Sequence, residues 1–169
     1  MDKTPSATKG ATMSQAIFNA IENRDLDALE QSLEGGASPL TVNEAGQRPL
    51  TLVASLIKQS FTAGDYEEEE RYKKMAAILI VHGAHDSDLQ HACGEVSNLG
   101  RHVCRYVIDH ALDQQESDPV ARLIEAKRLW FEEDDADAKA ELLDAIATGD
   151  REKVAAMMES GRMHYAYEQ

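Results

Sequence analysis

The segment from residue 35 to residue 54 constrains the fold more than any other part of the chain. It reads GGASPLTVNEAGQRPLTLVA, so two glycines, a polar stretch and a Pro-Leu step precede an apolar run. Gly36 can adopt the positive φ that ends a helix, and Asn43 and Gly46 suit the tip of a hairpin-like finger. Pro49 favours the first turn of a helix, where its missing N–H costs nothing. The segment therefore predicts a helix, a finger and a second helix in succession.

The first and last helical segments of the chain match each other. Each has apolar residues at helical spacing, a polar break with an aspartate that can cap the next helix, and a closing glycine. The matched positions are Ala20 with Ala145, Ile21 with Ile146, Asp25 with Asp150, Leu29 with Val154, Leu33 with Met158 and Gly36 with Gly161. This match within one chain favours a repeat architecture built from helix pairs.

The finger segment resembles the ankyrin repeat, whose consensus runs Gly-Ala-Asp, a turn, and then Gly-x-Thr-Pro-Leu-His-x-Ala-Ala. The matching residues are Gly36, Ala37, Gly46, Pro49, Leu50 and Ala54. The departures are Ser38 for the Asp, Arg48 for the Thr, Thr51 for the His and Val53 for the first Ala. The resemblance implies stacked helix pairs and a protein-binding function, because ankyrin repeats rarely carry out chemistry themselves.

We therefore predict an all-α, ankyrin-repeat-like helical solenoid of about four helix pairs, with one recognisable hairpin finger and an acidic insertion. The predicted pairs cover residues 14–37, 47–84, 87–112 and 118–161, within a single domain of residues 12–169. Residues 1–11 are expected to form a mobile tail, and residues 162–169 to close the array. Asp118 and Pro119 should start a helix that runs on through Trp130 and Phe131.

The second pair is longer than an ankyrin repeat of about 33 residues. The extra residues fall near 60–73, SFTAGDYEEEERYK. Four consecutive glutamates between Tyr66 and Tyr72 are expected to stay out of the core, so the segment should extend a helix or project as a loop. The plain interpretation is a solvated helix extension, and the functional alternative is an acidic contact for a basic partner.

The net charge of −14 comes from 31 acidic and 17 basic residues. A field of this sign repels phosphate backbones and anionic lipids, so neither nucleic acid nor a membrane is an expected partner. The charge serves either solubility or association with a basic protein. With no signal-like or membrane-spanning apolar run and no cysteine framework, a cytoplasmic location is expected.

The histidines and cysteines gather in one part of the chain. Cys93 and Cys104 lie in the same stretch as five of the six histidines, which are His82, His85, His91, His102 and His110. The spacings are irregular for a zinc site, and Cys93 replaces an alanine of the repeat, so a buried thiol is the favoured interpretation. No metal or cofactor is predicted, and metal binding by residues 82–110 remains an alternative.

The expected function is binding, because the chain has no nucleophile elbow, phosphate loop, zinc-protease motif or dinucleotide fingerprint. The ankyrin resemblance implies a partner face formed by the finger and the following helix. The candidate residues are Val42, Asn43, Glu44, Gln47, Arg48, Thr51 and Ser55, with Tyr66, Glu68 and Glu69 in the acidic insertion, and Trp130. For Trp130, packing in the core is the favoured alternative.

We expect a monomeric, non-catalytic binder or immunity-type inhibitor of a basic protein or enzyme. This expectation rests on analogy, since small acidic proteins of rigid shape suit the covering of basic active sites. A scaffold or adaptor, or an effector that binds a host protein, is the alternative among binding functions.

Overall fold

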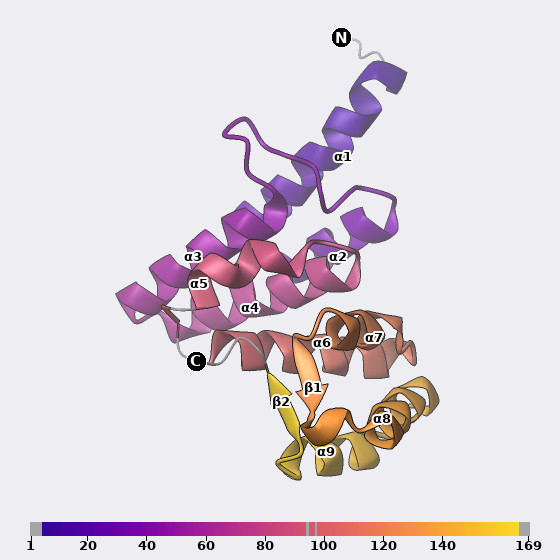
Figure 1. The fold of residues 1–169 in the computed structure, drawn as a ribbon. Helices are drawn as coiled ribbons and strands as arrows, with labels where there is room; N and C mark the ends of the chain where they lie inside the picture. Colours follow the sequence, from indigo (N-terminus) through magenta and orange to yellow (C-terminus); the bar gives the residue numbers. More distant parts are fainter. Residues whose placement is uncertain (1–4, 94, 97, 166–169) are drawn as a thin grey trace. The chain divides into compact units, whose positions relative to one another are not determined.

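A computed structural model describes residues 5–93, 95–96 and 98–165 of the chain. These residues are mostly helical (Figure 1), which confirms the predicted helical fold except for a short two-stranded sheet. The chain divides into two compact units, Met1–Val96 and Ser97–Gln169. None of the helices among the described residues is both long enough and apolar enough to cross a membrane.

The first unit is built from two long helix pairs and two short helical turns. Its elements are α1 (Pro5–Glu22), α2 (Leu26–Glu34), α3 (Pro49–Ala63), α4 (Tyr66–Val81), η1 (Asp86–Leu89) and α5 (Gln90–Cys93). Helix α1 packs against α2 and α3, and α4 packs against α2 and α3. The loop between α2 and α3 extends beside α1 (Figure 1). The core contains side chains of Leu50, Ile57 and Leu79 that are fully shielded from solvent.

The second unit combines helices with a two-stranded ribbon. Its elements are α6 (Leu99–Gln114), α7 (Asp118–Glu125), β1 (Leu129–Phe131), η2 (Glu132–Asp134), α8 (Ala136–Thr148), α9 (Arg151–Glu159) and β2 (Met163–Tyr165). Strand β1 pairs with β2 in antiparallel register, with Trp130 opposite His164. Helix α6 packs against α7 and α8.

One type of turn joins the helices within three of the pairs. The turns are Arg24-Asp25 between α1 and α2, Gly64-Asp65 between α3 and α4, and Gly149-Asp150 between α8 and α9, with φ of 57°, 74° and 74° at the first residue. In each turn the aspartate N–H donates to the carbonyl five residues earlier, at 2.8–3.0 Å. Its side chain then accepts from a backbone N–H of the following helix, at 3.0–3.2 Å. These caps explain why the aspartates recur in the sequence.

Helices α6 and α7 form a further pair that differs from the predicted one. Gln115 has φ of 51° between the two helices, and Lys127 has φ of 60° after α7. Gln115 stands at the turn within its pair, as Gly64 and Gly149 do in other pairs, and Lys127 follows its pair, as Gly36 and Gly83 do in the first unit; all of these residues have positive φ. The predicted pair 87–112 is therefore divided, because η1 and α5 pack on α3 whereas α6 packs on α7.

The prediction that one helix runs from Asp118 through Trp130 and Phe131 is wrong. Helix α7 ends at Glu125, and residues 129–131 form β1. Leu129 and Phe131 are buried while Trp130 faces outward, the alternation of a strand with one covered face. The partner strand, Met163–Tyr165, comes from the predicted closing segment, of which residues 166–169 lie outside the described residues.

Helix α1 begins at Pro5, so it overlaps the tail predicted at residues 1–11. Residues 1–4 lie outside the described residues, and the mobility of the tail stays a prediction.

The acidic insertion at residues 60–73 extends two helices and does not project as a loop. It comprises the end of α3, the left-handed Gly64, the cap Asp65 and the first turns of α4. The expectation that its four glutamates all stay out of the core is wrong for Glu69, which is 5% exposed, and the neighbouring Tyr72 is buried to the same extent. Lys73 Nζ lies 2.7 Å from Glu69 Oε2, and this pairing allows a carboxylate to be buried.

Candidate protein-binding site

The finger, residues 38–48, is held in shape by the side chain of Asn43. Its Oδ1 accepts from the backbone N–H groups of Ala45 and Gln47, both at 2.9 Å. The Asn43 N–H donates to the Gln47 carbonyl at 3.0 Å, and Gly46 provides the positive φ of 78° that the tip requires. The tip is therefore ordered by its own hydrogen bonds before any partner arrives.

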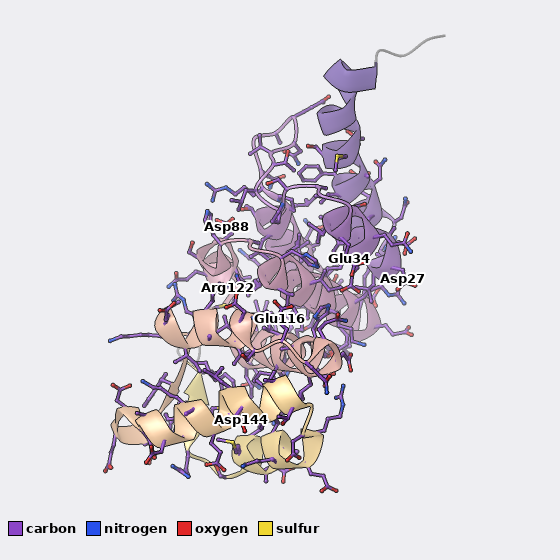
Figure 2. All side chains as sticks on the ribbon, turned by 90° about the vertical axis from the view of Figure 1, so that its right-hand side faces the viewer. Asp27, Glu34, Asp88, Glu116, Arg122 and Asp144 are labelled. Carbon is purple, nitrogen blue, oxygen red and sulfur yellow. The ribbon has the colours of Figure 1, made fainter. Side chains whose placement is uncertain are left out.

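Both arms of the finger are attached to helices of the first unit. On one arm, the Thr41 and Ser14 hydroxyl oxygens are 2.8 Å apart, which joins the finger to α1. On the other arm, Arg48 Nη1 donates to the Asp88 carboxylate of η1 at 3.2 Å (Asp88 is labelled in Figure 2). These two contacts fix the finger relative to the helices on both sides of it.

A groove of about 600 Å³ lies between the finger and α1. We refer to it as the finger groove. Its lining residues are Ser14, Gln15, Phe18 and Glu22 of α1 and Thr41, Val42, Asn43, Glu44 and Ala45 of the finger. Val42 is 56% exposed, whereas Phe18 is only 5% exposed. The groove thus has an apolar contact at its rim and an aromatic side chain packed beneath it.

The finger groove is acidic. Glu22 and Glu44 are exposed, and neither forms an ion pair with a residue that the structure describes. None of the described residues that line the groove is basic. Further exposed acids on α2, Asp27 and Glu34, are labelled in Figure 2. Unpaired carboxylates without neighbouring cations produce a negative potential, which attracts a positively charged group.

The predicted finger residues divide into two sets. Val42, Asn43 and Glu44 line the groove. Gln47, Arg48, Thr51 and Ser55 are half-buried and do not line it. The amide of Gln47 contacts that of Asn43 at 3.4 Å, and Arg48 is engaged with Asp88, so these two side chains support the finger.

The α1 residues that line the groove are not among the candidates predicted from the sequence. Ser14, Phe18 and Glu22 follow one another at intervals of four residues, so they form a stripe along one face of a helix. That spacing was available as a signal. What the sequence does not show is that the finger folds back over this stripe.

The candidates in the acidic insertion do not form a common site with the finger groove. Tyr66 is 70% exposed and lines a separate shallow cavity of about 460 Å³ with Leu26 and Arg71. Glu68 is paired with Arg24 at 2.8 Å. Glu69 is buried with Lys73, so its carboxylate is not available to a partner.

Trp130 belongs to the second unit and is 43% exposed, so it is not the core residue that the packing interpretation expects. Its ring stacks on that of His164, with centroids 4.5 Å apart and 27° between the ring planes. Phe131, at 2% exposure, supplies the buried aromatic contact in its place. Trp130 remains a surface candidate, separate from the finger.

The histidine and cysteine cluster does not form a metal site in the described part of the chain. No three His, Cys, Asp or Glu side chains among the described residues are arranged to hold a metal ion. Cys104 is buried and Cys93 half-buried, and the two are not joined in a disulfide. The His91 side chain lies outside the described set.

Comparisons with known proteins give no match to a protein-family model, to a curated protein or to a solved structure. The functional interpretation therefore depends on the geometry and charge of the chain itself.

Proposed function

We propose that the protein is a non-catalytic binding module that takes a basic segment of another protein into the finger groove and thereby inhibits that protein. One observation carries the proposal: among the described residues, the groove is lined by two carboxylates without an ion pair and by no basic side chain, and it includes the exposed Val42 of a finger fixed by its own hydrogen bonds. An acidic groove with an apolar rim suits a segment in which a lysine or arginine lies next to an apolar residue.

The rigidity of the finger supports this role. A tip already ordered by Asn43 loses little conformational freedom when a partner binds. The net charge of −14 adds a long-range attraction that speeds encounter with a basic protein. An inhibitor fits these features because a groove that occupies a basic segment blocks whatever that segment would otherwise bind.

We also propose that the architecture is ankyrin-repeat-like. The packing of α1 on α3 and of α4 on α2 supports stacked helix pairs, and the finger follows the second helix of a pair. In the ankyrin family the fingers and first helices contact partners, and the position of the finger groove between the finger and α1 supports the same use here. A cytoplasmic, monomeric protein remains the expectation.

The proposal is tested by affinity capture from the source cells with three baits. These are the wild-type protein, the groove variant Glu22→Lys/Glu44→Lys, and the control Asp144→Lys/Glu152→Lys. The two variants change the net charge equally, and the control residues are exposed on α8 and α9. We expect a basic protein that the wild type and the control retain and the groove variant loses, with an association rate that falls as salt rises. Equal retention, or equal loss from both variants, would contradict the proposal.

Inhibition is then tested separately from binding. The activity of the captured protein is measured while wild-type protein is added to stoichiometric amounts. A fall in activity that Glu22→Lys/Glu44→Lys does not produce supports an inhibitor. Unchanged activity with intact binding would favour a scaffold or adaptor.

A further inference from the structure

The second unit contains a cavity of about 820 Å³ bordered by the end of α7, strand β1 and the turn before α8. We refer to it as the Trp130 cavity. Its apolar lining includes Ile124, Leu129, Trp130 and Phe131, and its acidic lining includes Glu125 and Glu133. It combines an exposed aromatic ring, an apolar floor and carboxylates.

Trp130 is the exposed member of an otherwise buried strand. Leu129 and Phe131 are 0% and 2% exposed and pack inward, whereas 43% of Trp130 remains accessible. His164 stacks on one face of the indole, which holds the ring in place. An indole that is fixed in orientation and open to solvent is a strong contact for an apolar or cationic group.

The backbone around the cavity is unusual. Of the six non-glycine residues with positive φ in the described chain, three line this cavity: Lys127, Glu133 and Asp134, with φ of 60°, 59° and 51°. Lys127 closes α7, whereas Glu133 and Asp134 follow one another in the turn between β1 and α8. Residues held in such conformations cluster at binding sites, where the surrounding structure enforces them.

Two carboxylates of the cavity lining, those of Glu125 and Glu133, can accept hydrogen bonds from an incoming cation. Asp134 is occupied by Lys139, and Lys127, the other basic lining residue, also acts electrostatically on Asp134. Glu125 and Glu133 are exposed and form no ion pair within the described ranges. Among the described residues, the lining therefore has three carboxylates against two ammonium groups, and the two carboxylates without an ion pair are both glutamates.

We propose that the Trp130 cavity binds an arginine side chain of a basic partner protein. The guanidinium lies against the accessible part of the Trp130 ring and donates hydrogen bonds to Glu125 and Glu133, while its methylene groups contact Ile124. Arginine fits better than lysine because its planar, weakly hydrated cation stacks on aromatic rings and donates to carboxylates in a fixed geometry. The site is in the second unit and does not depend on the finger groove.

The fluorescence of Trp130 reports on this site alone, because the chain contains a single tryptophan. The full-length protein is titrated with a capped Leu-Arg-Leu peptide and with the same peptide carrying citrulline, the neutral isostere of arginine. We expect a saturable change with the arginine peptide and binding weaker by about tenfold or more with the citrulline peptide. No change with the arginine peptide, or equal binding of both, would overturn the proposal.

Variants test the named residues. The double variant Glu125→Gln/Glu133→Gln is expected to lower the affinity for the arginine peptide by about tenfold and to leave the affinity for the citrulline peptide unchanged. Asp144→Asn/Glu152→Gln changes the net charge equally on exposed positions of α8 and α9 and should have no effect. Trp130→Leu, measured by calorimetry, should abolish binding, with circular dichroism checking that the fold is kept. If the cavity variant and the control variant weakened binding of the arginine peptide equally, the effect would come from overall charge, and the proposed site would be overturned.

Discussion

The two units differ in what the chain does after a helix pair ends. In the first unit, the chain turns at Gly36 after α2 and forms the finger. In the second unit, it turns at Lys127 after α7 and forms strand β1, and it turns at Gly161 after α9 and forms strand β2. The turns inside the pairs are alike, with a left-handed residue followed in most of them by a capping aspartate. The segments that leave the pairs are what differ. In the first unit this segment folds over α1, and in the second unit two such segments hydrogen-bond to each other.

The comparison separates stability from recognition. The helix pairs bury the large apolar side chains of both units. Two of the departing segments expose large apolar side chains near carboxylates: the finger exposes Leu40 and Val42, with Glu44 nearby, and the β1 segment exposes Trp130, with Glu133 nearby. Substitutions of buried residues within the pairs should therefore affect unfolding. Substitutions of exposed residues in the finger and the β1 segment, and of the α1 and α7 residues that line the same cavities, should affect binding.

The largest effect is expected at the buried ion pair of α4. Glu69→Leu leaves Lys73 without its carboxylate at 4% side-chain exposure, so unfolding should become easier by about 3–5 kcal/mol. The double variant Glu69→Leu/Lys73→Met should recover much of that loss in chemical denaturation. The second unit offers a control at the same spacing, since Asp118 and Arg122 of α7 pair at 3.9 Å on the surface (Figure 2 labels Arg122). Asp118→Ala should cost about 1 kcal/mol or less, and similar losses at both sites would contradict the burial of Glu69.

Fully buried leucines of the two units should give similar losses. Leu50 of α3 and Leu142 of α8 are both fully shielded from solvent. Leu50→Ala and Leu142→Ala should each lower the free energy of unfolding by about 2–5 kcal/mol, from lost burial and the cavity left behind. Denaturant unfolding followed by circular dichroism measures both, and a negligible loss for either would show that its helix pair is not packed as described.

The elements that the sequence predicted are those fixed by local residues. Gly36, Asn43, Gly46 and Pro49 each act within a few residues of the chain, so the finger could be placed before its structure was known. The sequence did not predict the pair α6/α7, because the left-handed positions at its turns hold Gln115 and Lys127 and not glycines, which would have marked the turns.

The remaining features depend on contacts between distant or unexpected partners. Strand β1 has three residues and pairs with a strand more than thirty residues further along, so no local pattern reveals it. The burial of Glu69 depends on how α4 packs, which a run of glutamates conceals. In the binding site, Val42 and Glu44 follow from the finger, whereas Phe18 and Glu22 join them only through folding.

The turns within pairs can be compared by adding one methyl group. Gly64 and Gly149 both have φ of 74°, and a Cβ on Gly64 would meet nothing within 4 Å. Gly64→Ala should cost about 1–2 kcal/mol from the left-handed conformation alone. A Cβ on Gly149 would approach Gln115 Nε2 at 2.6 Å, displacing the hydrogen bond from Gln115 to the Thr148 carbonyl. Gly149→Ala should cost about 0.5–1.5 kcal/mol more than Gly64→Ala, and thermal unfolding that ranks the two variants the other way would contradict this contact.

The smallest effect concerns alkaline pH. Burial raises the pKa of Tyr72 in the first unit and of Tyr165 in the second. Because the folded pKa lies above the unfolded value of about 10, the folded state holds these protons more tightly. The stability from each tyrosine is therefore complete below about pH 10 and declines as the pH rises through the folded pKa. Tyr72→Phe and Tyr165→Phe should each reduce the alkaline loss of stability, and an unchanged slope in both would contradict the burial of these hydroxyls.

Hydrogen–deuterium exchange of the complex with the captured basic protein tests most directly whether the departing segments are the recognition surfaces. We expect the amides of residues 41–45 and of the α1 stripe at residues 14–22 to exchange more slowly in the complex than in the free protein. The turn between α8 and α9 should exchange at the same rate in both. Protection confined to the helix pairs, with the finger unchanged, would contradict the finger groove as the binding site.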